Sequence, residues 1–376
     1  MNKTVGTRSL SGAESFEPAS RSALFTLNFK PQAGESVAAF CARIGRELAV
    51  RAAEPLHVLA FGSVQAAPAF ASALAEALGA CPCPVTWAEG GACDGGAVAG
   101  VQVFAVSGAS VERIIAGDRV VGSVFSGGGC RQCVVGGLVA PRDGGSRAAA
   151  ARRTLELLES ALAQAGFGLA DVVRTWFFLD DLLAWYEAFN RVRAEVYART
   201  AFRAGCLPAS TGVAARNPAG APLSVAAWAL QPLDGATRVV EVPSPLQGPA
   251  RAYGSWFSRA VEVIGGDSAA GETGARRRLW ISGTASIAPD GRTLYPGRAR
   301  LQIEHTLRVI EAILESRGYG FGHVTRAVAY FKSAADAALF GAWQECRELR
   351  RLPVVQTVCG ICRGELEFEV EVDAVR

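Results

Sequence analysis

The feature that most constrains how this chain folds is an internal repeat. Similar residues recur at a constant offset of 152 positions, so that Thr154, Leu155, Leu158, Leu162, Gly166, Phe167, Gly168, Val172 and Arg174 correspond to Thr306, Leu307, Ile310, Leu314, Gly318, Tyr319, Gly320, Val324 and Arg326. Their leucine and isoleucine members follow the i, i+3, i+7 spacing of one helix face, and the first glycine of each copy suits the end of that helix. One folding unit is therefore present at least twice.

The rest of each copy predicts one order of elements. A strand at 172–179 or 324–331 follows the glycines, then a second helix, a proline (Pro208 or Pro353) and a terminal strand at 223–230 or 366–375. An apolar stretch that runs into glycine, 121–128 or 279–286, precedes the first helix. The order β-α-β-α-β predicts mixed sheets packed with helices, which is an α+β fold.

The remainder of the chain indicates a third unit. Residues 22–108 have the same order of elements without the glycine signature, as in a degenerate copy. We therefore expect a disordered tail at 1–20, a degenerate unit at 21–115, a second unit at 116–240, a linker at 241–277 and a C-terminal unit at 278–376. The linker assignment depends on its glycines and prolines and on its lack of a helical period, and it carries the motif YGSWFSRA.

Composition excludes several classes of protein. Of the 376 residues, 50% are hydrophobic and 19% are charged, which is typical of a globular protein. Residues 1–20 contain no apolar run long enough for a signal peptide or a membrane span, so we expect a cytoplasmic protein with no membrane partner. A net charge of +3 on this length is too small to attract the negatively charged backbone of a nucleic acid. We therefore expect no nucleic acid as a partner.

The cysteine pattern does not predict a metal site. Ten cysteines without an export signal are expected to be reduced, and Cys130/Cys133 and Cys359/Cys362 have the spacing of zinc half-sites. The three histidines each lie in or beside an apolar segment, and no compact Cys/His module completes a set of four ligands. We therefore expect no metal, and a Ser-His-Asp triad is disfavoured by the same inventory.

The last strand alternates apolar residues with glutamates. Leu366, Phe368, Val370 and Val372 share one face, and Glu365, Glu367, Glu369 and Glu371 share the other. This period predicts a half-buried strand. The residues alone leave two interpretations of the glutamate face open, a solvated row or a face with one buried acid.

The repeat motifs resemble a known family. GYGF, VTRAVAYF, a proline and LEFEVEVDAV in this order are similar to the YjgF-like imine deaminases, whose members trimerise around facing sheets with sites at the subunit junctions. The resemblance implies that tandem YjgF-like, chorismate mutase-like units on one chain form a pseudo-trimer, with one or two active junctions. Those deaminases hold the substrate carboxylate with an arginine after the proline, and the matching positions here are Ser210 and Val355. Deaminase chemistry is therefore disfavoured.

A second resemblance covers nearly the whole chain. PASTGV (208–213), YGSWFSRAV (253–261), ISGTASI (281–287) and CRGELEFEVE (362–371) are together similar to the chorismatases, which split chorismate into pyruvate and a ring product. The pattern is nearest the bacterial hydroxybenzoate synthases of pigment or quinone pathways. We therefore expect chorismate as the substrate, with no cofactor.

This resemblance implies two catalytic residues. Glu369 matches the catalytic glutamate of the family, and aligning the terminal strands on Leu223 and Leu366 places it opposite Ala226, which favours one working site and one silent site. A carboxylic acid can protonate the enolpyruvyl methylene carbon near neutral pH if burial keeps it protonated. Cys362 matches the cysteine of members that make 3-hydroxybenzoate, although a small buried residue without a role remains an alternative.

The substrate has two carboxylates, so the site must supply cations. Arg363 has the strand parity of Glu369, and Arg259 lies in the FSRA motif, so both are candidates for bidentate binding. Thr211 and Thr284 could bind the ring hydroxyl or the ether oxygen, and Tyr253 is a further candidate. Cys359, Glu367 and Glu371 are interpreted as structural.

The expected function is cleavage of chorismate to pyruvate and 3-hydroxybenzoate, alone or with 4-hydroxybenzoate. The alternatives on the same scaffold are an imine deaminase and a non-catalytic protein that binds a small molecule. The oligomeric state has two alternatives: a monomer, in which the three units form an internal pseudo-trimer, or a homo-oligomer. The sequence does not predict the ratio of products, which depends on water exclusion.

Overall fold

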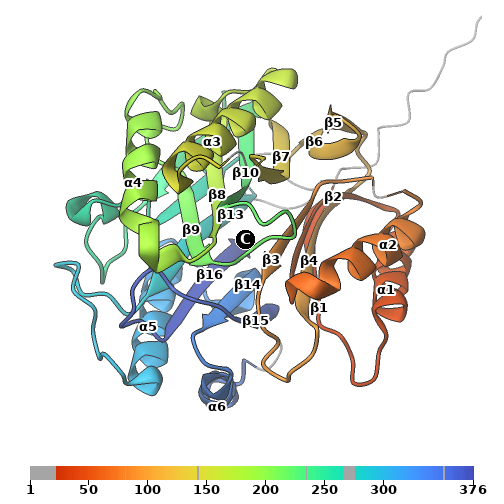
Figure 1. The fold of residues 1–376 in the computed structure, drawn as a ribbon. Coiled ribbons are helices and arrows are strands. Elements are labelled where there is room, and N and C mark those ends of the chain that lie inside the picture. Colours follow the sequence, from red (N-terminus) through yellow and green to blue (C-terminus); the bar gives the residue numbers. More distant parts are fainter. Residues whose placement is uncertain (1–22, 81, 142–143, 234, 266–275, 350–351) are drawn as a thin grey trace, which may run out of the picture.

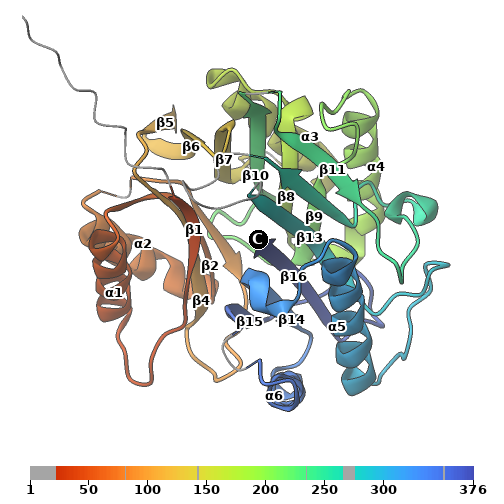
Figure 2. The same cartoon turned by 180° about the vertical axis from the view of Figure 1, so that it is seen from behind.

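The structure is a computed structural model. It describes residues 23–80, 82–141, 144–233, 235–265, 276–349 and 352–376. The tail expected at 1–20 lies outside the described residues. Three sheets surround a common centre, and the helices lie on the outside (Figures 1 and 2).

The first sheet has the strand order β1-β4-β2-β3 and belongs to the N-terminal unit. Its elements are β1 Ala23–Phe29, α1 Val37–Val50, β2 Ala53–Gly62, α2 Ala67–Leu78, β3 Val85–Glu89 and β4 Val98–Ser107. This unit has the element order expected of the third, degenerate copy of the repeat. It lacks the glycine signature because α1 ends without the glycine that ends the corresponding helices of the other two units.

The second sheet has the order β5-β6-β7-β10-β8-β9. Its unit contains β5 Val111–Ala116, β6 Arg119–Gly127, β7 Cys130–Val139, α3 Arg147–Gln164, β8 Val172–Leu179, α4 Leu182–Ala198, β9 Ala209–Ala214 and β10 Leu223–Pro232.

The third sheet has the order β11-β12-β13-β16-β14-β15, the same arrangement as the second. Its unit contains β11 Arg238–Val242, β12 Ala260–Ile264, β13 Arg277–Ala285, α5 Ala299–Ser316, β14 Val324–Phe331, α6 Ala337–Cys346, β15 Val354–Val358 and β16 Phe368–Val375. In every sheet the last parallel pair, β2–β3, β8–β9 or β14–β15, flanks antiparallel strands. The predicted α+β fold of tandem units with mixed sheets is confirmed.

The three units close into a ring. The strand β3 packs against β7, β9 against β13, and β15 against β4, so each unit presents its parallel edge to the next. The predicted pseudo-trimeric arrangement therefore exists within one chain. Its axis passes between the three sheets (Figure 1).

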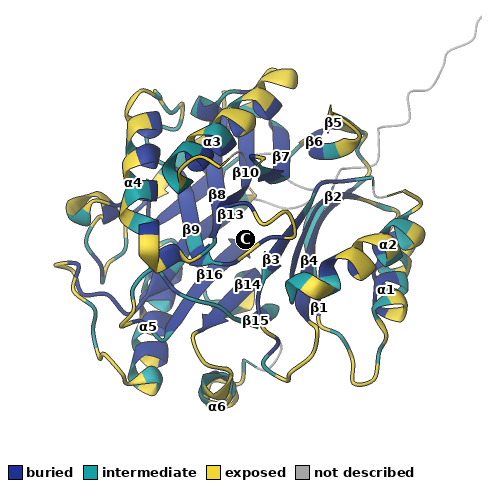
Figure 3. Cartoon of the chain, viewed as in Figure 1, coloured by how far each residue is buried: buried dark blue, intermediate teal, exposed yellow. Residues whose placement is uncertain are grey.

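The closed ring of three units explains which residues are buried. One hydrophobic cluster combines residues of all three sheets, among them Phe104, Trp176, Trp228 and Trp280, while each unit has a second cluster between its sheet and its two helices. Most strands are therefore buried on both faces, except β5 and β11, which keep exposed residues, and exposed residues otherwise concentrate on the helices and loops (Figure 3). The half-buried strand predicted from the alternation at 366–375 is wrong, because the second face meets the other two units rather than solvent.

The repeated glycines end helices as predicted. Gly166 follows α3 with φ 70° and Gly318 follows α5 with φ 77°, a left-handed conformation that glycine adopts without steric cost. In both copies the next backbone N–H bonds back to a leucine carbonyl, from Phe167 to Leu162 and from Tyr319 to Leu314. The offset of 152 residues therefore repeats one helix-to-strand turn.

Part of the segment expected as a linker, 241–277, belongs to the third sheet, namely β12 and the end of β11, while its residues 266–275 lie outside the described residues. The strands β11 and β12 pair as an antiparallel hairpin, and the long loop between them, 243–259, contains YGSWFSRA after its first ten residues. A linker was inferred because short strands in a glycine- and proline-rich stretch show no helical period. The stretch 121–128 is a strand, as expected, but it belongs to β6. Its equivalence to 279–286 is wrong, because the strand equivalent to β13 is β7.

Among the described residues, no helix is long and apolar enough to span a membrane.

Candidate active site

A cavity of about 310 Å³ lies where the second unit meets the third. Its wall is built from α4, β9, β13, β16 and the loops 243–259 and 359–367, and the lining includes Glu369, Cys362, Arg363, Arg259 and Tyr253. Five residues proposed from separate sequence motifs therefore meet at one junction. A cavity of this volume is at the lower end of the range for small-molecule sites, roughly 300 to 1,000 Å³.

Glu369 lies near the start of β16, the strand in the middle of its sheet, opposite Ala285 of β13 and Tyr330 of β14. Its side chain is only 4% exposed. Burial, and then the negative charge of Glu371, raise the pKa of Glu369 to about 8. The carboxyl is therefore largely protonated at neutral pH.

Gly283 makes room for this carboxyl. A Cβ placed on Gly283 would lie 2.1 Å from Oε1 of Glu369, closer than any van der Waals contact allows. Gly283 lies in a β-bulge, because Ile281 and Thr284 of β13 pair with Val372 and Val370 of β16. The extra residue of the bulge bends β13 beside the acid.

Glu371 is two residues further along the same face, and its environment is opposite. Both guanidinium groups of Arg174 and Arg326 pair with its carboxylate, and the indole N–H of Trp176 donates to it at 3.0 Å. Burial alone would raise the pKa of Glu371, but the two guanidinium groups and the hydroxyl of Thr211 lower it overall. Glu371 is therefore a buried carboxylate, while Glu369 is a buried acid.

These two glutamates decide between the interpretations of the glutamate face. Glu369 and Glu371 are buried, Glu367 is half-buried and Glu365 is exposed, so the face changes from solvent to interior along the strand. The interpretation of the glutamates as a solvated row holds only for Glu365 and Glu367, which precede β16.

The strand register corrects the residue that was aligned with Glu369. Phe178 and Tyr330 are equivalent by the repeat, and they pair with Ser224 and Glu369 respectively. Ser224, and not Ala226, is the counterpart of Glu369. The sequence alignment on Leu223 and Leu366 was displaced by two residues because Leu366 lies in the turn before β16.

Cys362 is partly buried and lines the cavity. Burial, and then the charge of Glu369, raise the pKa of the Cys362 thiol to about 12. The sulfur is therefore present as a thiol at neutral pH, and it can donate a hydrogen bond or a proton but is a poor nucleophile.

The two predicted arginines flank Tyr253. The guanidinium carbons of Arg259 and Arg363 lie 5.3 and 5.5 Å from the centre of its ring. Arg259 donates from Nε and Nη2 to the carbonyl of Gly248, both at 3.0 Å, and Arg363 donates to the carbonyl of Gly291 at 2.6 Å. These backbone contacts fix both cations at the cavity wall and leave further N–H groups for a ligand.

The two predicted threonines are not among the lining residues. The Thr211 hydroxyl donates to Glu371 and accepts from the backbone N–H of Gly283 at 3.1 Å, while Thr284 donates to the carbonyl of Ser282 at 2.8 Å. Both hydroxyls therefore have protein partners, and Thr211 joins the bulge of β13 to the carboxylate network.

Sequence reasoning missed the contribution of α4. Tyr186, Asn190 and Arg193 line the cavity, and Arg193 is 2% exposed with its Nη2 2.7 Å from Oδ1 of Asn190. Its Nε has no hydrogen-bond partner among the described residues. The signal was present, since these polar residues follow the i, i+4, i+7 spacing of one helix face.

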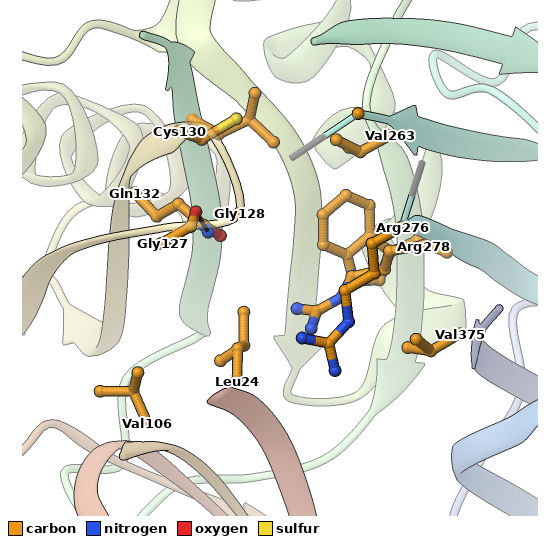
Figure 4. A pocket seen from close by; sticks show the side chains of 13 residues that line it. Leu24, Val106, Gly127, Gly128, Cys130, Gln132, Val263, Arg276, Arg278 and Val375 are labelled. Atoms are coloured by element: carbon orange, nitrogen blue, oxygen red, sulfur yellow. Dashed lines mark hydrogen bonds between the residues drawn. The ribbon is translucent and has the colours of Figure 1, made fainter. Parts of the chain in front are cut away.

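A second, smaller cavity lies on the pseudo-threefold axis (Figure 4). Its lining comes from all three sheets, and the guanidinium groups of Arg276 and Arg278 lie side by side over it. Its volume is about 60 Å³, which is too small for a ring compound. The junction cavity with Glu369 is the better candidate.

A crystal structure of a chorismatase aligns over 94% of this chain and 99% of its own chain, with a TM-score of 0.61 and 17% identity. This chain has the chorismatase fold. The predicted resemblance is confirmed in fold, across both the repeated units and the N-terminal one.

Shorter structures align over about a third of this chain. The YjgF gene product from E. coli aligns over 36% of this chain with 18% identity and a TM-score of 0.27, and yeast Mmf1 over 37% with 16% identity and a TM-score of 0.28. Each alignment covers 98% of the other chain. No protein-family model matches the sequence, and no curated protein matches it.

Proposed function

We propose that this protein cleaves chorismate into pyruvate and 3-hydroxybenzoate, alone or with 4-hydroxybenzoate. The observation that carries the proposal is Glu369, a buried carboxyl with a pKa raised to about 8, at a cavity with two fixed arginines. The fold shared with a chorismatase supports the choice of substrate.

The first step is a proton transfer to carbon. Glu369 gives its proton to the methylene carbon of the enolpyruvyl group and becomes a carboxylate, and the ether carbon becomes an oxocarbenium ion. Breaking the bond between the ring and the ether oxygen then releases pyruvate. A negative Glu369 next to the developing cation stabilises the transition state.

The ring product follows from what replaces the departing oxygen. If the neighbouring ring hydroxyl oxygen bonds to the ring carbon that loses pyruvate, its bond to its original ring carbon then breaks. Loss of a proton from the ring gives 3-hydroxybenzoate, and the atoms of chorismate divide between the two products. If water adds instead, one molecule of water is consumed and a dihydroxycyclohexadiene remains. We propose that Cys362, whose thiol stays protonated, assists the first route by donating a hydrogen bond to the oxygen that moves between the two ring carbons.

The two carboxylates of chorismate require cations at two places. Arg259 and Arg363 lie at one wall, beside Tyr253, and Arg193 lies on α4 with an unpaired Nε among the described residues. We propose that Arg363 and Arg259 bind one carboxylate and Arg193 the other. The reaction needs only proton transfers, so we expect no cofactor.

The test compares the parent protein with Glu369→Gln. Chorismate is supplied, pyruvate is followed by a coupled assay, and the ring product is identified by chromatography. We expect pyruvate and 3-hydroxybenzoate from the parent and a loss of about 100- to 10,000-fold in rate for the variant, the usual contribution of a general acid.

Glu367→Gln is the matched control, because Glu367 belongs to the same alternating run but pairs with Lys332 near the surface. It should retain the parent rate. A parent that releases no pyruvate would contradict the proposal, and ammonia release from an imino acid would identify a deaminase instead.

A further inference from the structure

A larger cavity, about 750 Å³, lies where the first unit meets the second. Its lining comes from α2, β3, β7 and the start of β10, with the turn between β5 and β6 and the loop after β9 at its rim. The candidate active site plays no part in it.

The ring of units makes this cavity the counterpart of the active-site cavity. The elements α2, β3, β7 and β10 occupy the places that α4, β9, β13 and β16 occupy at the next junction. Gly137 lies in a bulge of β7 that is equivalent to the bulge of β13 with Gly283, since Val135 and Leu138 pair with Ala227 and Val225 of β10. Ser224 has the position of Glu369 by strand register.

Two differences change what this junction can do. Ser224 is not an acid, so the proton donor of the other junction is missing. The hairpin β5–β6 turns through Gly117 and Asp118, whereas the hairpin β11–β12 carries the long loop 243–259 that supplies Tyr253 and Arg259. The first junction is therefore open and lacks the cations that those loop residues provide.

The wall of this cavity is apolar and aromatic. Phe70 and Trp87 lie with ring centres 5.1 Å apart, and Val85, Val139 and several alanines of α2 complete the surface. Such a surface suits a flat ring.

Two polar side chains belong to the wall. Trp87 is 6% exposed, and its indole N–H has no hydrogen-bond partner among the described residues. Ser224 is 2% exposed and also lines the cavity. A buried donor without an acceptor is costly, so an acceptor on a bound ligand would stabilise it.

The charges at the rim balance. Asp118 and Arg119 are adjacent and exposed, and Arg119 donates to the carbonyl of Gly137 at 3.2 Å. An anionic ligand would be attracted by Arg119 and repelled by Asp118, so the two charges together favour an uncharged ligand.

We propose that this junction is a second ligand site, which binds an uncharged single-ring aromatic compound with a hydrogen-bond acceptor and does not transform it. The ring lies against Phe70 and Trp87, and the acceptor receives the indole N–H or the Ser224 hydroxyl. The proposal depends on the geometry of this junction and not on chorismate cleavage.

The test uses 3-bromobenzamide, an uncharged ring with an amide acceptor. Isothermal titration should show one binding site in the parent protein, and a crystal soaked with the compound should show the anomalous bromine signal beside Trp87. Ala71→Phe places a ring in the cavity from an exposed position of α2 and should weaken binding at least tenfold. Ala69→Phe is the control, since Ala69 is exposed on the same helix outside the lining.

Trp87→Phe keeps an aromatic surface but removes the N–H, and it should weaken binding by about three- to tenfold. Chorismate turnover should be unchanged in Ala71→Phe, which separates this site from the active site. If Ala71→Phe proves unfolded by circular dichroism, Ala75→Leu fills the same cavity. Absence of binding, a bromine signal only beside Glu369, or equal affinity in Ala71→Phe and the parent would each overturn the proposal.

Discussion

At the scale of single residues, two glutamates two positions apart have opposite ionisation. Glu369 lies beside a cavity, has no ion-pair partner among the described residues and keeps its proton, whereas Glu371 has two guanidinium groups and loses it. The negative charge of Glu371 also helps to raise the pKa of Glu369. The buried carboxylate network therefore tunes the acid beside it.

The pKa of Glu369 predicts the pH dependence of the reaction. The acid form is required, so kcat/KM should be constant below about pH 7 and fall tenfold per pH unit above about pH 8. Because folding raises this pKa from 4.5, the unfolded chain ionises at Glu369 before the folded protein does, so this residue makes folding less favourable as the pH rises from about 4.5 to 8. Glu369→Gln should therefore be inactive yet at least as stable as the parent at pH 8, which thermal unfolding would check. A variant with a clearly lower Tm would contradict this assignment.

The raised pKa of Cys362 predicts slow alkylation. At pH 8 its thiol is almost entirely protonated, so iodoacetamide should modify the exposed Cys346 first and leave Cys362 largely unmodified, as peptide mass spectrometry would show.

Cys362→Ala should keep pyruvate release within about tenfold and shift the ring product from hydroxybenzoate toward the dihydroxycyclohexadiene. An unchanged product ratio would mean that Cys362 only fills space.

At the scale of elements, one bulge and one loop distinguish the active junction. The bulge of β13 brings Gly283 beside Glu369, and the backbone N–H of Gly283 bonds to Thr211 on β9. The loop 243–259 then covers the cavity with Tyr253 and Arg259. The equivalent bulge of β7 exists without such a loop, so the bulge alone does not make an active site.

Gly283→Ala tests this element. The added methyl group would lie 2.1 Å from the Glu369 carboxyl and must displace it, and a displacement of about 1 Å can cost about 100-fold in rate. We expect kcat to fall by about that factor with little change in Tm. Gly212→Ala is the control, because Gly212 lines the same cavity but its added Cβ meets no atom within 4 Å. Equal losses in both variants would contradict the role of the bulge.

At the scale of the whole molecule, a buried polar network connects the three units. Arg174 comes from the second unit, Arg326 and Glu371 from the third, and Gln102 of the first unit accepts from Nε of Arg326 at 2.6 Å. Gln102 also donates to the carbonyl of Ala327 at 2.9 Å. This network fixes the orientation of the sheets around the axis.

Removal of its central charge should destabilise the chain. Glu371→Gln leaves two buried guanidinium groups without their carboxylate, and we expect the free energy of unfolding to fall by about 3–5 kcal/mol in urea titrations. The pKa of Glu371 is lowered in the folded state. The parent protein should therefore lose the stability that the ionised Glu371 provides as the pH falls through its folded-state pKa. Glu195→Gln, which breaks an exposed pair with Arg152, should change stability by less than about 1 kcal/mol. Similar effects of the two variants would contradict a central role for the network.

The sequence by itself determined the repeat, the helices and the strands β8, β10, β13, β14 and β16. The i, i+3, i+7 spacing and the two glycines identify α3 and α5 because helix periodicity and left-handed turns are local properties. It also provided Glu369, Cys362, Arg363, Arg259 and Tyr253, through motifs that follow one another in order along the chain.

Only the tertiary structure decided which strand faces are buried, since the second face of β16 meets two other units. It also made β11 and β12 strands of the third sheet, placed Arg193 at the cavity and identified Ser224 as the counterpart of Glu369. These facts depend on contacts between residues far apart in the sequence and on strand register. A local pattern does not contain them, because burial and pKa depend on what packs against a residue from elsewhere in the chain.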